Sequence, residues 1–258
     1  MKKLLTAAIT LLTASTSAEA HFLLLKPQND IVNSREIRLT AKFTHPMEGS
    51  PNMPFRIDRS GAVINGRTLP IEWKEKKIAA APGSKEKVPM YIGKLKIHRP
   101  GVYQIFVVPS AYFEPAEQKF IRQITKVYVE AFGLEEGWQK PIGLKAEIVP
   151  VTRPFGLWEG NTFVGRVLFN GKPAANIRVE VEYYNKEGIK PPNQALVTQV
   201  VQTDENGYFI YTIPWSGWWG FSAIGRGGKK RYRDGKLYPV ELDAVLWIKA
   251  YPKPGGVK

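Results

Sequence analysis

The sequence contains no cysteine and only three histidines among its 258 residues. Without cysteine there are no disulfide bonds, thiolate metal sites or cysteine nucleophiles. The sequence also lacks the motifs G-x-S-x-G and H-E-x-x-H, a P-loop, and a G-x-G-x-x-G that follows a strand. We therefore expect a protein without catalytic activity. Any histidine-based site must be built from His21, His45 and His98.

Long apolar runs are scarce as well, and the clearest short one lies at the N-terminus. Two lysines precede an apolar stretch from Leu4 to Leu12, and "AEA" at residues 18–20 has the A-x-A pattern of a signal-peptide cleavage site. The stretch is too short to span a bilayer. We expect residues 1–20 to be a signal peptide, the mature chain to begin at His21, and the protein to be periplasmic.

Positive charge dominates, with 37 Lys and Arg against 23 Asp and Glu and a formal net charge of +14. Such an excess is typical of proteins that bind nucleic acid, an anionic membrane face or an acidic partner. Export argues against nucleic acid. Most of the basic residues are scattered, and the one cluster, at residues 226–233, lies among glycines. We expect this cluster to be a solvated loop tip.

Alternation of apolar and polar residues is the main periodic signal, and it indicates β-strands. It is clearest at residues 36–43 and 177–183, and further candidate strands lie at 102–108, 124–129, 144–149, 164–169, 208–213 and 244–248. Asn-Gly and Asp-Gly pairs separate many of them. Helical signal is weak and limited to residues 115–120 and 131–139. We expect an all-β protein with two immunoglobulin-like β-sandwich domains, residues 21–140 and 141–258.

Signal-peptide cleavage would give His21 an α-amine beside its imidazole. The two groups have ordinary pKa values of about 8 and about 6.5, so both can be deprotonated near neutral pH at modest cost. His45 continues the inward parity of the strand at residues 36–43, and Pro46 ends regular pairing. Two nitrogens from His21 and one from His45 suit nickel, cobalt or copper.

Oxygen donors that could complete such a site follow at two places in the sequence. Glu48 lies three residues after His45, and the segment "AYFEPAE" provides Tyr112 and Glu114. Carboxylates also commonly orient ligand histidines from outside the metal site. His98 stands just before a turn, and we expect it at the surface. The predicted metal site therefore consists of His21, His45, Glu48, Tyr112 and Glu114.

Several segments together resemble a known family: "AHFLLLKP", "FTHPMEG", "VPSAYFEPAEQKF", "TRPFGLWEGNTFVGRVLFNGKPAANIRVEVEYYN" and "TDENGYFIYTIPWSGWWGFSA". The family comprises periplasmic proteins associated with bacterial nickel and cobalt uptake, catalogued as a domain of unknown function. The resemblance covers essentially the whole mature chain. It implies a metal-binding accessory protein that passes nickel or cobalt to an energy-coupling or ABC-type membrane transporter. His21 and His45 match its "AH" and "HP-E-G" positions.

Three alternatives remain open at this point. A periplasmic copper carrier could use the same ligands, because the Irving–Williams order favours Cu²⁺ at nitrogen sites. An oxidative enzyme could hold copper through the N-terminal histidine. A carbohydrate-binding or adhesion module without metal would be expected to expose Trp215 and Trp218 together.

Overall fold

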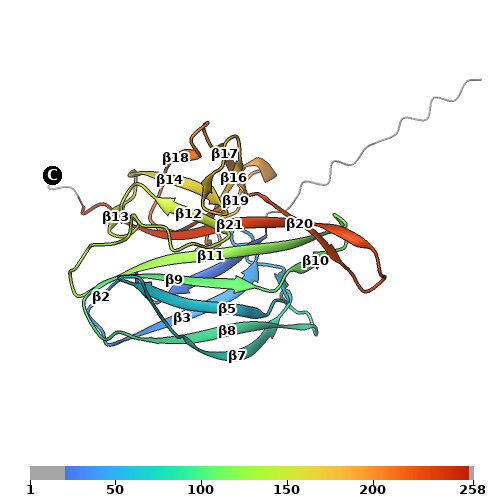
Figure 1. The fold of residues 1–258 in the computed structure, drawn as a ribbon, viewed down its shortest axis with the longest axis horizontal. Helices are drawn as coiled ribbons and strands as arrows, with labels where there is room; N and C mark the ends of the chain where they lie inside the picture. The colour runs from blue at the N-terminus through green and yellow to red at the C-terminus, as the bar shows by residue number, and fades with distance from the viewer. Residues whose placement is uncertain (1–20, 256–258) are drawn as a thin grey trace, which may run out of the picture.

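The computed structural model describes residues 21–255, and these residues form an all-β protein (Figure 1). Within that range one short 3₁₀ helix, η1 (Gln194–Leu196), interrupts the strands. Over the same residues, no helix has the length and apolar character needed to cross a membrane. The all-β class expected from the alternating pattern is confirmed. The expected signal peptide, residues 1–20, lies outside the described residues.

Residues 21–255 form three sheets. The first contains β1 (Phe22–Pro27), β3 (Glu36–Thr44), β8 (Lys87–Lys96) and β7 (Glu72–Ala79) in that order, with β4 (Asn52–Met53) paired to β3. The third contains β12 (Ala146–Pro150), β14 (Thr162–Phe169) and β15 (Lys172–Pro173), with β18 (Tyr208–Thr212) paired to β14.

The second sheet is the largest. Its order is β17 (Gln199–Gln202), β16 (Arg178–Tyr183), β19 (Gly217–Ala223), β21 (Leu237–Tyr251), β11 (Lys119–Ala131), β9 (Gly101–Pro109), β5 (Ile57–Ile64) and β6 (Arg67–Leu69). The strands β2 (Ile31–Val32), β10 (Tyr112–Glu114), β13 (Leu157–Trp158) and β20 (Arg226–Arg231) pair with β11 or β21 at its margins.

The large sheet lies between the other two and contributes to two hydrophobic cores, as the layers in Figure 1 show. Successive side chains of a strand point to opposite faces. In β21, Val245 and Trp247 therefore join the core toward the first sheet, whereas Leu246 and Ile248 join the core toward the third. Strands buried on both faces explain the nearly continuous apolar run "AVLWI".

Strand pairing continues across residue 140, the expected domain boundary. The strand β11 comes from the first half of the chain and β21 from the second, and they pair in parallel from Phe120↔Val240 to Val127↔Trp247. Two sandwich-like layers are thus built on one shared sheet. The division into residues 21–140 and 141–258 stays a prediction.

Some of the local structure predicted from the sequence is confirmed, and some is wrong. At Asn65–Gly66 and Asn170–Gly171 both residues have positive φ, the geometry that tight hairpins require. The expected helix at residues 115–120 is wrong, because a turn there connects β10 to β11. The basic cluster is also no simple loop tip, since residues 226–231 form strand β20, paired with β21.

Candidate functional site

His21 and His45 lie side by side at one end of the first sheet. The strands β1 and β3 are antiparallel with Phe22 opposite Thr44, so the next pair outward is His21 and His45. Their ring centroids are 4.6 Å apart and the rings meet edge to face at 71°. The side chain of His45 is 2% exposed, in agreement with the inward parity of its strand.

Each histidine contacts a carboxylate. Nε2 of His21 is 3.4 Å from Oε2 of Glu114, and Nδ1 of His45 is 3.4 Å from Oε2 of Glu48. The ring centroid of Tyr112 is 6.4 Å from that of His21. Burial and the negative charge of Glu114 raise the pKa of Tyr112, which keeps the phenol protonated at neutral pH. The structure thus brings all five residues of the predicted site together.

The third histidine lies elsewhere. His98 is exposed and follows β8, whose end at Lys96 pairs with Glu36 at the start of β3. His45 follows the other end of β3. His98 is therefore separated from the His21–His45 pair by the length of a strand, as expected for a surface residue.

No complete metal cage is present in residues 21–255: no group of three or more His, Asp or Glu side chains there could hold a metal ion. The proposed third nitrogen is not a side chain. In the unprocessed chain the backbone nitrogen of His21 belongs to the peptide bond with Ala20. The role of the five residues as metal ligands stays a prediction.

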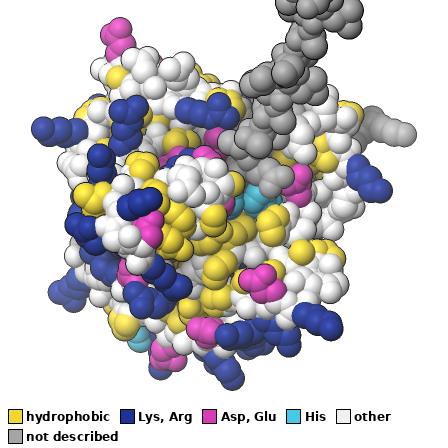
Figure 2. All heavy atoms as spheres, turned by 90° about the vertical axis from the view of Figure 1, so that its right-hand side faces the viewer, with side chains coloured by type: hydrophobic (Ala, Val, Ile, Leu, Met, Phe, Trp, Pro, Cys, Tyr) yellow, Lys and Arg dark blue, Asp and Glu magenta, His cyan; other side chains and the backbone are white. Residues whose placement is uncertain are grey.

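The two histidines open into a cleft of about 530 Å³ that is also lined by residues of β11, β16, η1 and β21. Figure 2 views the molecule from the right-hand side of Figure 1, and a patch of histidine side chain is visible near the centre of this face. Five carboxylates and two basic side chains line the cleft: Glu48, Glu117, Glu180, Glu182, Glu241, Lys119 and Arg178. In a chain of net charge +14, this cleft is therefore a place where carboxylates outnumber basic side chains.

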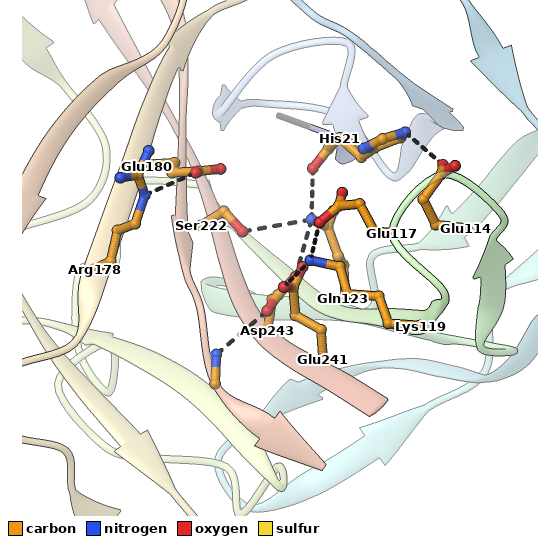
Figure 3. A network of polar contacts seen from close by, with 11 residues as sticks. His21, Glu114, Glu117, Lys119, Gln123, Arg178, Glu180, Ser222, Glu241 and Asp243 are labelled. Carbon is orange, nitrogen blue, oxygen red and sulfur yellow. Dashed lines mark hydrogen bonds and ion pairs between the residues drawn. The ribbon is translucent and has the colours of Figure 1, made fainter. Parts of the chain in front are cut away.

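Gln123 on β11 fixes the backbone next to the histidine pair (Figure 3). Its Nε2 donates to the carbonyl of His21 at 2.5 Å, and its Oε1 accepts from the backbone N–H of Leu23 at 2.7 Å. Nε2 also contacts Asp243 on β21 at 3.3 Å and Ser222 on β19 at 3.5 Å. Three strands of the large sheet therefore determine where the first residue of the expected mature chain lies.

The carboxylates of the cleft are not equivalent. Nζ of Lys119 is 2.6 Å from both Glu117 and Glu241. Burial lowers the pKa of Lys119, but hydrogen bonds to these two carboxylates outweigh it and the pKa lies above its ordinary value. Burial raises the pKa of Glu182 to about 8 and also raises the pKa of Glu180. Glu182 is therefore largely protonated at neutral pH.

Sequence reasoning missed the members of this network that come from β11, β16 and β21. Burial raises the pKa of Asp243, the buried carboxyl that contacts Gln123, well above its ordinary value. A signal was present, because Gln123 in "FIRQITKVYV" lies between Ile121 and Val127 on one face of its strand, and Asp243 in "LDAVLW" precedes Val245 and Trp247 on the same face. Buried polar residues in such strands need partners and mark places of interest.

The tryptophans do not form the exposed pair that a carbohydrate platform would need. Trp218 is 7% exposed and Trp219 1% exposed. The indole of Trp215 packs 5.0 Å from that of Trp219 and 5.5 Å from the ring of Tyr183, between ring centroids. Trp219 and Trp215 belong to the core toward the third sheet, whereas Trp218 belongs to the core toward the first sheet.

Fold and cleft define a class: an all-β, multi-sheet protein with a carboxylate-rich cleft beside a histidine pair. Residues 18–227 match a family described as a domain of unknown function (DUF4198), and the chain belongs to that family. No curated protein matches the sequence.

Solved structures resemble the chain only weakly. The D00-D0 domain of intimin aligns at 12% identity over 90% of this chain and 100% of its own, with a TM-score of 0.22. Trypsin-activated alpha-2-macroglobulin from Escherichia coli aligns at 9% identity over 89% of this chain and 16% of its own, with a TM-score of 0.23. BcpA, the major pilin of Bacillus cereus, aligns at 10% identity over 90% and 67%, with a TM-score of 0.21. These scores support no functional argument.

Proposed function

We propose that this protein is an exported, non-catalytic binder of a divalent transition-metal ion, captured at His21 and His45 and delivered to a membrane transporter. The observation that carries the proposal is the adjacency of the two imidazoles, with centroids 4.6 Å apart, at the residue where cleavage is expected. Cleavage would add the α-amine of His21 as a third nitrogen. That amine and Nδ1 of the same residue can chelate one ion.

The carboxylates support this assignment of donor atoms. Glu114 contacts the Nε2 edge of His21, and the amine chelate uses the opposite edge of that ring. Glu48 contacts Nδ1 of His45, so His45 would contribute Nε2. Carboxylates placed in this way orient metal-binding imidazoles and raise their basicity. Glu48, Glu114 and Tyr112 could also serve as oxygen donors, and Glu48 lines the cleft beside the two histidines.

Two different arguments bear on which metal ion the protein binds. Nickel or cobalt, and the delivery to an energy-coupling or ABC-type transporter, rest on the resemblance seen in the sequence. Nitrogen donors alone bind Cu²⁺ more tightly than Ni²⁺ or Co²⁺. A copper carrier is therefore the alternative that the same geometry serves.

Calorimetric titration of the exported protein with Ni²⁺, Co²⁺ and Cu²⁺ tests the proposal, after mass spectrometry has shown which residue comes first. One extra residue before His21 should weaken binding by about a hundredfold, because it converts the amine to an amide. His45→Ala removes a proposed ligand and should weaken binding by at least about tenfold, the smallest loss typical of removing a residue that only orients a ligand. Affinity should also fall as the pH drops below about 7, because protons compete for the same nitrogens.

His98→Ala is the matched control, since it removes the one histidine that lies far from the pair, and its affinity should equal that of the parent protein. If the extended protein binds as tightly as the parent, the amine is not a ligand. An equal loss in His98→Ala and His45→Ala would show unspecific histidine binding and refute the site.

A further inference from the structure

A basic arm projects from the large sheet, and none of its residues belongs to the predicted metal site. It is the hairpin of β20 and the start of β21, residues 226–238, seen at the right of Figure 1. Its sequence "RGGKKRYRDGKLY" holds six basic residues and one acid. Within the part of the chain that the structure describes, no ion pair involves any of the six.

Asp234, the single acid of the arm, forms hydrogen bonds within the turn at the tip of the arm. Asp234 accepts hydrogen bonds from the backbone N–H of Lys236 at 3.0 Å and from the hydroxyl of Tyr238 at 2.7 Å. Nη1 of Arg231 donates to the carbonyl of Gly235. These bonds give the tip a defined shape, so its cations are presented together.

Aromatic packing fixes the base of the arm against β10. The ring of Tyr232 stacks on Phe113 with centroids 3.9 Å apart, and Tyr238 meets Phe113 at 5.0 Å. Phe113 stands between Tyr112 and Glu114, the two β10 residues that lie beside His21. The arm and the histidine site thus share one short strand and the same side of the molecule.

Two basic grooves flank the arm. One, of about 600 Å³, is lined by five cations and a single acid: Arg59, Arg122, Lys145, Lys229, Lys230 and Asp58. Its apolar wall includes Ile124 and Leu242. The other, of about 570 Å³, has four cations, four aromatic side chains besides Tyr112, and no acid among its lining residues.

We propose that the arm and its two grooves bind the surface of an anionic phospholipid bilayer. The charges are complementary to lipid phosphates, and each basic residue near such a surface adds attraction. Leu237 is 55% exposed at the tip, and Tyr232 and Tyr238 are half-buried beside it. Tyrosines and basic residues around an exposed apolar side chain suit the membrane interface better than an acidic protein surface.

Co-sedimentation of the full exported protein with vesicles tests the proposal. We expect binding to mixed phosphatidylcholine and phosphatidylglycerol vesicles, weakening with salt, and little binding to pure phosphatidylcholine. Replacing Lys229, Lys230 and Arg231 together by alanine should reduce affinity by about tenfold or more. Leu237→Ala, which changes no charge, should reduce it by about threefold.

The matched control removes the same number of charges from exposed positions on another sheet, with Lys74, Lys76 and Lys77 of β7 replaced by alanine. It should bind within about twofold of the parent. An equal loss in both triple variants would show that net charge alone acts, and would overturn the proposal. Circular dichroism confirms that each variant folds. Binding of poly-glutamate without binding of anionic vesicles would identify an acidic polypeptide as the partner and refute the lipid.

Discussion

At the scale of single residues, Gln123 shows how a side chain outside the histidine pair can position it. Its amide contacts the backbone around the start of β1 twice, at the carbonyl of His21 and at the N–H of Leu23. Behind it stands Asp243, whose pKa is raised by burial. A protonated carboxyl can remain buried without an ion-pair partner, because burial disfavours the charged form of the group and not the neutral one.

Glu182 gives a pH-dependent prediction. Burial raises its pKa to about 8 in the folded protein, against an ordinary value of 4.5. Stability from this protonated carboxyl is therefore fully present below about pH 4.5 and is lost as the pH rises toward 8. Glu182→Gln cannot ionise, so its free energy of unfolding should exceed that of the parent by about 1–3 kcal/mol at pH 8.

Urea unfolding of both proteins at a series of pH values measures this difference. The advantage of Glu182→Gln should grow between pH 4.5 and about 8 and then level off. Glu205→Gln, at an exposed turn position, is the matched control and should show no such growth. A difference independent of pH would contradict the raised pKa.

At the scale of elements, the alternation within strands could be predicted from the sequence, but pairing between distant strands could not. The inward parity of His45 followed from four residues of its own strand. Its pairing partner beside His21 depends on the register between β1 and β3, which local periodicity does not specify. The contact between Gln123 and Asp243 joins residues 120 positions apart through a parallel strand pair. No local pattern encodes such a pair.

A buried ion pair connects β11 to β12. Nζ of Lys126 lies 2.7 Å from Oε1 of Glu147 and 2.8 Å from the hydroxyl of Tyr128. Glu147 also accepts hydrogen bonds from the backbone N–H groups of residues 142–144. This carboxylate therefore ties the connection after residue 140 to the large sheet.

Lys126→Met should destabilise the protein by about 3–5 kcal/mol, because it leaves the charge of Glu147 buried without its cation. Denaturant unfolding measures the loss. Lys145→Met, at an exposed position two residues before Glu147, should change stability by less than about 0.5 kcal/mol. Equal effects of the two substitutions would refute the role of the buried pair.

At the scale of the whole molecule, the shared sheet argues for cooperative unfolding. The strand β21 supplies Val245 and Trp247 to one core and Leu246 and Ile248 to the other. Neither core can lose this strand without the other being exposed. We expect a single calorimetric transition whose van't Hoff and calorimetric enthalpies agree. Two separate transitions would instead favour independent domains on either side of residue 140.

The alternation of β11 and β21 has a consequence for how the chain can change in length. Gln123 and Glu241 face the histidine cleft, whereas Arg122 and Leu242, their immediate neighbours, face a basic groove on the opposite side. A single inserted or deleted residue in either strand would exchange the two faces of that strand. Side chains that now line the basic groove would then face the histidine cleft. Related sequences should therefore tolerate insertions at the arm tip, between Tyr232 and Lys236, while the lengths of β11 and β21 stay constant.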